Sequence, residues 1–117
     1  MVNVNVKQNG GPVLVTIAVG HNQINTHRMF RWESDLTNPQ PLPTNMSGNY
    51  LVGDAATLNQ KVISWEVRIA ASTPSNPEPY SVTIFLTQDG QTRQIDQLVG
   101  TMTLGVQVNG SARITLV

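Results

Sequence analysis

Residues 63–69 read Ile-Ser-Trp-Glu-Val-Arg-Ile, and this stretch decides the fold. Its apolar residues stand at every second position, with Ser64, Glu66 and Arg68 between them. Successive side chains of a β-strand point to opposite faces, so this alternation is typical of a strand with one buried face. The stretch therefore predicts a strand that contributes one side to a hydrophobic core.

The same alternation recurs along the chain, over residues 2–7, 13–19, 80–87, 102–108 and 112–116, and more weakly over 26–33 and 92–98. The segment 92–98 contains few apolar residues, which is typical of an edge strand. No stretch has the period of a long amphipathic helix. The sequence predicts an all-β chain, a two-sheet antiparallel sandwich of seven to eight strands of the immunoglobulin-like or jelly-roll kind.

Three turn signals stand between alternating runs: Asn9-Gly10-Gly11, Asp89-Gly90 and Asn109-Gly110. Asn-Gly and Asp-Gly accept the positive φ angles of tight hairpin turns. We expect them to join the first strand to the second, 80–87 to 92–98, and 102–108 to 112–116.

The longest connection runs over residues 34–60. Its prolines over 38–43 favour an extended, unpaired chain, residues 50–52 fit a short strand, and Asp54 is placed to cap one helical turn. If strand directions alternate, this connection lies at the same end of the sandwich as the three turn signals. Loops on a rigid scaffold often carry function, so we expect a site at that end.

The bulk composition limits the classes of function. A length of 117 residues fits one domain spanning residues 1–117, and cysteine is absent. Net charge is zero with only 7 Lys and Arg, so we expect no nucleic-acid binding. No apolar run is long enough to span a bilayer, so we expect no membrane insertion. The compartment is not assigned by these features.

Catalytic and cofactor motifs are not evident. The chain has no Gly-x-Ser-x-Gly elbow, no phosphate-binding glycine loop and two histidines, so we expect neither an enzyme nor a bound cofactor. A metal site is left open. His21 and His27 with Glu33 or Asp35 would be one set of ligands, and Asp35, Asp54 and Asp89 would be a set for calcium.

Candidate ligand-binding residues collect at the end with the long connection. They are Asp35, Asn49, Tyr50, Asp54 and Asp89. Tyr50 is the best aromatic candidate for contact with a ligand, whereas Phe30, Trp32 and Trp65 fit core packing. Phe85 falls on the polar side of its strand and would mark a contact surface.

These features favour a non-enzymatic recognition domain that binds a carbohydrate or a cell-surface partner. Its polarity comes from Asn, Gln, Ser and Thr, because charged residues make up only 12% of the chain, and such side chains both donate and accept hydrogen bonds. The alternative is a structural, self-assembling subunit that forms a homo-oligomer through strand edges or the Phe85 side. A small hydrolase is the third hypothesis, and it needs a side-chain cluster that the sequence does not reveal.

Overall fold

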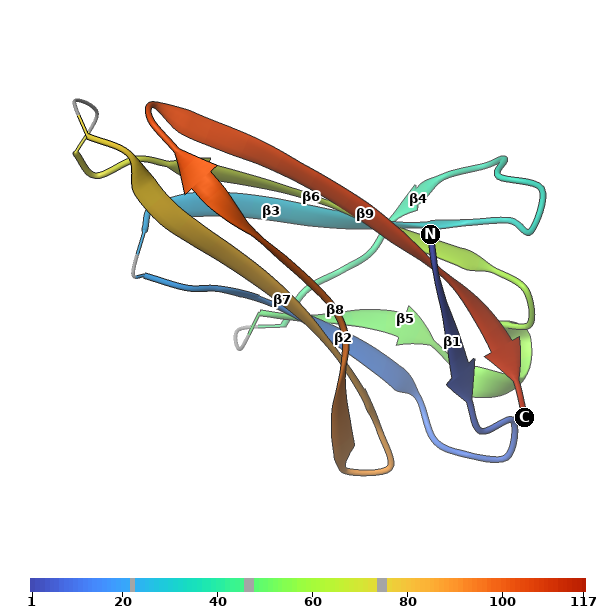
Figure 1. The fold of residues 1–117 in the computed structure, drawn as a ribbon. Coiled ribbons are helices and arrows are strands. Elements are labelled where there is room, and N and C mark those ends of the chain that lie inside the picture. Colours follow the sequence, from blue (N-terminus) through green and yellow to red (C-terminus); the bar gives the residue numbers. More distant parts are fainter. Residues whose placement is uncertain (22, 46–47, 74–75) are drawn as a thin grey trace.

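The computed structural model describes residues 1–21, 23–45, 48–73 and 76–117 (Figure 1). These described residues contain nine strands and one short 3-10 helix. They are β1 (Val2–Val6), β2 (Val13–Val19), β3 (Asn25–Trp32), β4 (Gln40–Pro41), β5 (Asn49–Gly53), η1 (Ala55–Thr57), β6 (Val62–Ala70), β7 (Glu78–Gln88), β8 (Gln91–Met102) and β9 (Gly105–Leu116).

The strands form two packed sheets, which confirms the predicted all-β sandwich (Figure 1). One sheet has the order β1-β9-β6-β3-β4 and the other β5-β2-β7-β8. The order β9-β6-β3 is that of the G, F and C strands in immunoglobulin sandwiches, whereas here the long β7–β8 hairpin lies in the chain between β6 and β9. Among the strands that the structure describes, β1 pairs with β9 in parallel and the other pairs are antiparallel.

The core lies between the sheets and takes the inward side chains of both. Trp65 of β6 is its largest member, with 1% of its surface exposed. The core cluster contains apolar residues from every described strand except β4, including Val15, Ile84 and Ile114. The predicted core position of Trp65 is confirmed.

The Asn109-Gly110 pair is not a turn, so that predicted hairpin is wrong. β9 runs unbroken from Gly105 to Leu116, and Gly110 lies opposite Trp65 of β6. A Cβ atom on Gly110 would lie 2.5 Å from the Trp65 Nε1 atom. Glycine is needed here because the indole ring fills the space where a side chain would stand.

The Asn9–Gly11 connection also forms no hairpin, contrary to the prediction. β1 pairs with β9, from Val2 opposite Ala112 to Val6 opposite Leu116, and β2 belongs to the other sheet. The connection therefore crosses between sheets. The Asp89-Gly90 hairpin is confirmed: φ is 53° at Asp89 and 72° at Gly90, and β7 pairs with β8 on either side of them.

The long connection after β3 contains more pairing than predicted. Gln40 and Pro41 form β4, opposite Arg31 and Phe30 of β3, so this stretch is not unpaired. Proline fits there because β4 is an edge strand, where a missing N–H costs no ladder bond. The predicted strand at Tyr50 is confirmed as part of β5, and η1 begins directly after Asp54.

One long side of the sandwich has open strand edges. β1 covers β9 only over Ala112–Leu116, and among the described residues no strand pairs with the outer edge of β8. Figure 1 looks onto this side, with β1, β8 and β9 in the foreground. The opposite side is bridged by the chain itself, where Thr44 pairs with Tyr50.

Candidate binding site

Tyr50, the aromatic residue expected to meet a ligand, lies in the core. Its side chain is 3% exposed. The ring packs edge-on against His27, with 5.6 Å between ring centroids. Tyr50 therefore supports the interior of the sandwich and offers no stacking surface to a ligand.

His27 and Tyr50 form a closed hydrogen-bond pair. The Tyr50 hydroxyl lies 2.7 Å from His27 Nδ1 and 2.9 Å from the His27 carbonyl oxygen. A hydroxyl has one proton, so the pair is satisfied when Nδ1–H donates to the hydroxyl and the hydroxyl donates to the carbonyl. Burial lowers the pKa of His27 and raises the pKa of Tyr50, so the neutral forms are favoured.

Of the other four predicted residues, three have side chains that are already hydrogen-bonded within the protein. Asp35 accepts a hydrogen bond from Thr37 Oγ1 at 2.6 Å, which lowers its pKa. Asn49 accepts from Thr16 Oγ1, and Asp89 accepts from the Gly11 backbone N–H at 2.8 Å. Asp54 is exposed, and its carboxylate makes no capping hydrogen bond. Among the described residues, no three His, Asp or Glu side chains cluster to hold a metal ion.

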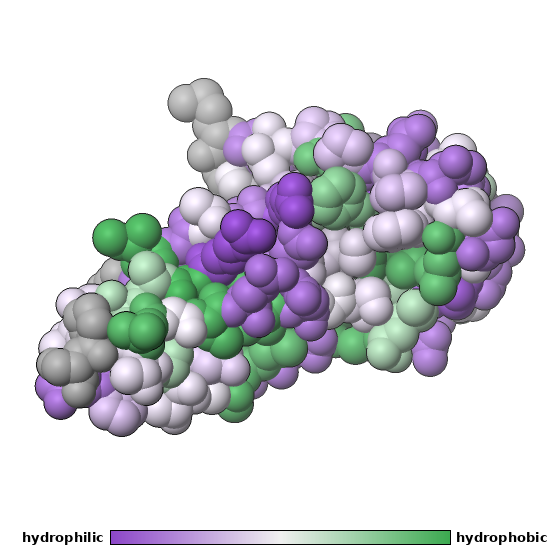
Figure 2. Space-filling model, turned by 90° about the horizontal axis from the view of Figure 1, so that it is seen from above, coloured by the Kyte–Doolittle hydropathy of each residue, from purple (hydrophilic) through white to green (hydrophobic). Residues whose placement is uncertain are grey.

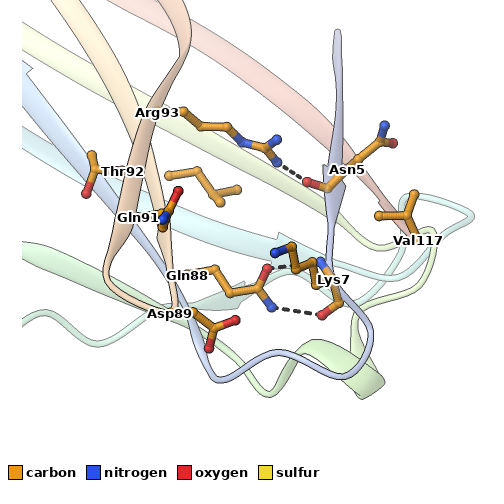
Figure 3. Close-up of a pocket in the computed structure, with 9 residues that line it drawn as sticks. Asn5, Lys7, Gln88, Asp89, Gln91, Thr92, Arg93 and Val117 are labelled. Atoms are coloured by element: carbon orange, nitrogen blue, oxygen red, sulfur yellow. Dashed lines mark hydrogen bonds between the residues drawn. The ribbon is translucent and has the colours of Figure 1, made fainter.

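Asp89 contributes to a hollow of about 360 Å³ at the loop end, between β1 and the β7–β8 hairpin (Figure 3). Gln88 crosses it: its Nε2 donates to the Lys7 and Gly11 carbonyls at 2.8 and 3.2 Å, and its Oε1 accepts from Lys7 N at 2.9 Å. Arg93 donates to the Asn5 carbonyl. These bonds fasten β1 to the hairpin, so the hollow is better explained as a joint between sheets than as a binding site.

A second hollow, of about 340 Å³, lies on the five-stranded sheet. It is lined by Thr26, His27, Arg28, Glu66 and Arg68. Thr26 lies opposite Arg68, and Arg28 opposite Glu66, on neighbouring strands. Residues that are directly opposite share one sheet face, and these polar side chains point away from the core.

Polar side chains continue this face in hydrogen-bonded rows. Arg28 pairs with Glu66, and Arg68 Nε donates to Gln107 Oε1 at 3.2 Å. Gln107 Nε2 donates in turn to Asn109 Oδ1 at 3.2 Å. The rows join β3, β6 and β9, so Arg28, Glu66, Arg68 and Gln107 are each supported by a neighbour on another strand, and Asn109 by Gln107 on its own strand.

Phe30 and Trp32 lie on this outer face and not in the core, contrary to the prediction. Both are half-buried. The Arg28 guanidinium lies 5.3 Å from the Phe30 ring centroid, and Trp32 Nε1 donates to Ser64 Oγ at 2.7 Å. The alternation over residues 26–33 is compatible with either set of side chains facing the core. Met29 faces the core because His27 and Arg31, on the same face of β3, have hydrogen-bond partners there. His27 is bonded to Tyr50, and Arg31 to the Val52 carbonyl.

We define the outer face by these residues: Thr26, Arg28, Phe30, Trp32, Ser64, Glu66, Arg68, Gln107 and Asn109. Figure 2 views the molecule from this side and shows strongly hydrophilic residues gathered near its middle, beside a hydrophobic patch toward the left end. Val62, opposite Trp32, is only 2% exposed although it is not part of the core cluster. The outer face therefore combines aromatic surface with hydrogen-bonding groups of both kinds.

Comparison with known proteins gives no relative, because no protein-family model, no curated protein and no solved structure matches this chain. Within the described part of the chain, no helix has the length and apolar character needed to cross a membrane.

Proposed function

We propose that this chain is a non-enzymatic recognition domain that binds a carbohydrate on the outer face of its five-stranded sheet. The observation that carries the proposal is a hollow of about 340 Å³ lined by Arg28, Glu66 and Arg68, whose side chains are held by the Arg28–Glu66 and Arg68–Gln107 contacts. Half-buried Phe30 and Trp32 lie on the same face of the sheet. None of the five residues predicted at the loop end belongs to this face.

The side chains of the outer face match the chemistry of a sugar. Guanidinium groups donate hydrogen bonds, carboxylates accept them, and amides do both, so together they satisfy neighbouring hydroxyls. Aromatic rings offer apolar surface to the C–H groups of a pyranose ring. The hydrogen bonds between Arg68, Gln107 and Asn109 hold these groups in place, which reduces the entropy lost when a ligand binds.

The charges at the hollow favour an acidic sugar. Arg28 and Arg68 face it with Glu66 as the one carboxylate among its lining residues. Arg28 keeps 62% of its side chain exposed, so its remaining N–H groups are free to approach a ligand. Guanidinium binds carboxylate through two parallel hydrogen bonds, and we expect carboxylated glycans to bind more tightly than neutral ones.

A glycan array followed by calorimetry tests the proposal. Arg68→Ala is expected to weaken binding of the best glycan at least about tenfold, which corresponds to ~1.4 kcal/mol. Lys7→Ala removes a cation from the other hollow and serves as the control for net charge, with affinity unchanged. If the folded protein binds no glycan on the array, or if both variants lose affinity equally, the proposal is wrong.

A second candidate function is that of an assembly subunit. The outer edge of β8, which pairs with no strand in the described part of the chain, favours it, because open strand edges pair readily with other strands. Measurement of molar mass in solution separates an assembling chain from a strictly monomeric one.

A further inference from the structure

We propose that two copies of this chain associate through the outer edges of their β8 strands, antiparallel and with Val99 opposite Val99 of the second copy. The two four-stranded sheets then join into one continuous sheet. This inference stands on the β8 edge and does not depend on the glycan proposal.

The N–H and C=O groups of Val99 point away from β7, toward the open edge of the sheet. The Gly20 N–H donates to the Ser81 carbonyl, so the backbone groups of Ser81 point toward β2. Those of its neighbours Tyr80 and Val82 therefore point toward β8, where they lie opposite Gly100 and Leu98. Since consecutive residues direct their N–H and C=O groups to opposite edges, Val99 presents its own pair to the open side.

Over residues 97–102, the edge of β8 lacks three features that commonly prevent strand addition: charged residues, prolines and bulges. Residues 97–102 contain no charged residue and no proline, and the register of β8 with β7 is regular there. The bulge in β8 lies outside this stretch, at Ile95, between Gln94 opposite Phe85 and Asp96 opposite Ile84. Val99 is 66% exposed. Natural edges are commonly interrupted by charges, prolines or bulges, so an edge that lacks them is typical of a strand-pairing surface.

A twofold register centred on Val99 is self-complementary. It places Gln97 opposite Thr101 of the second copy and Leu98 opposite its Gly100. Asp96 lies opposite Met102 of the second copy, so no two like charges face each other. In this arrangement the same stretch of β8 in each copy supplies the hydrogen-bond donors and acceptors for the other, as an isologous interface requires.

The joint at the other end of β8 limits the register. Arg93 is bonded to the Asn5 carbonyl of β1, so the stretch before residue 94 is already approached by the chain's own edge strand. Centring the pair on Val99 keeps the second copy clear of β1. A register centred closer to Arg93 would bring the second copy into contact with β1.

The first test is molar mass by sedimentation or light scattering, up to about 1 mM protein. The wild-type mass is expected to rise toward twice that of one chain. Val99→Lys places two ammonium groups opposite each other and is expected to remain monomeric, whereas Leu36→Lys makes the same change at an exposed residue of the β3–β4 connection and is expected to associate like wild type. Circular dichroism checks that both variants are folded.

The second test fixes the register. The chain has no cysteine, so Val99→Cys introduces a single thiol, and mild oxidation is expected to give a covalent dimer in high yield. Leu36→Cys is the matched control and is expected to cross-link poorly. The proposal is overturned if the wild-type chain stays monomeric at about 1 mM. This holds even if the β8 edge binds an unrelated extended peptide, because the proposed partner is a second copy of the chain. So does association that Val99→Lys leaves unchanged.

Discussion

Gly110 and Trp65 make a matched pair at the scale of single residues. The indole occupies the space above the glycine Cα, and a Cβ there would lie within 2.5 to 2.6 Å of three indole atoms. The Trp65 Nε1 atom is buried with no hydrogen-bond partner among the described residues. The site therefore combines tight packing with an unsatisfied donor, and it has little freedom to rearrange.

Gly110→Ala is expected to lower the free energy of unfolding by about 1–3 kcal/mol, because the added methyl group displaces the indole. Asn109→Ala is the control, since Asn109 is exposed on β9, and its effect is expected to stay within about 0.5 kcal/mol. Urea denaturation measures both. A loss for Asn109→Ala as large as that for Gly110→Ala would contradict the assignment of the effect to the contact between Gly110 and Trp65.

The His27–Tyr50 pair makes stability depend on pH. Burial lowers the pKa of His27 from its ordinary value of 6.5, so the unfolded chain takes up a proton before the folded chain does. The resulting stability is present above about pH 6.5 and is lost as pH falls through that value toward the folded pKa. We expect the urea midpoint to decrease between pH 7.5 and 5.5.

The matched variant for this prediction is His27→Asn, which keeps an N–H donor near the Nδ1 position and cannot titrate. Its urea midpoint is expected to change less than that of wild type over the same pH interval. An equal pH dependence in both proteins would show that another group is responsible.

At the scale of strands, hydrogen bonds between the β7–β8 hairpin and residues 5–11 join the two sheets at the loop end. Gln88 makes three hydrogen bonds with the backbone of Lys7 and Gly11. Each neutral hydrogen bond contributes about 0.5–1.5 kcal/mol net. Gln88→Ala is expected to destabilise the protein by ~1–3 kcal/mol and to speed hydrogen exchange in β1, whereas Gln91→Ala, in the same hairpin, leaves both unchanged. If hydrogen exchange rises equally in β6, the Gln88 hydrogen bonds do not act locally on β1.

The strands themselves are predictable from alternation, but only part of their pairing is. Val108 and Ala112 are separated by an even number of positions, so a continuous strand places both side chains on the same face, whereas a two-residue hairpin at Asn109-Gly110 would place them on opposite faces. The alternation therefore favours a continuous strand over the hairpin. The crossing at Asn9–Gly11 has no such local signal. The partner of Val2 is Ala112, and pairing over that separation is decided by the packing of the whole core.

The outer face illustrates the same limit at the scale of the molecule. Arg28 and Glu66 are 38 positions apart in the chain, and Gln107 lies farther still. They meet because β3, β6 and β9 are neighbours in one sheet with a fixed register. Periodicity indicates which residues share a face of their own strand, but not which strands lie side by side, so the sequence pointed to the loop end instead.

The two proposals predict avidity when they are combined. The twofold axis between paired antiparallel strands stands perpendicular to the sheet, so both copies of a β8-linked dimer turn their outer faces to the same side. Wild type is then bivalent toward a glycan-coated surface, and its apparent affinity is expected to exceed that of Val99→Lys by about 10²–10⁴. Calorimetry with the monovalent sugar is expected to give equal affinities, because Val99 lies on the other sheet.

Arg68→Ala separates the two effects, since it is expected to keep the dimer mass and to lose binding in both assays. Equal surface affinity for wild type and Val99→Lys, in a protein that is shown to dimerise, would mean that the outer faces do not point to one side. The mode of pairing, and not the glycan site, would then be wrong.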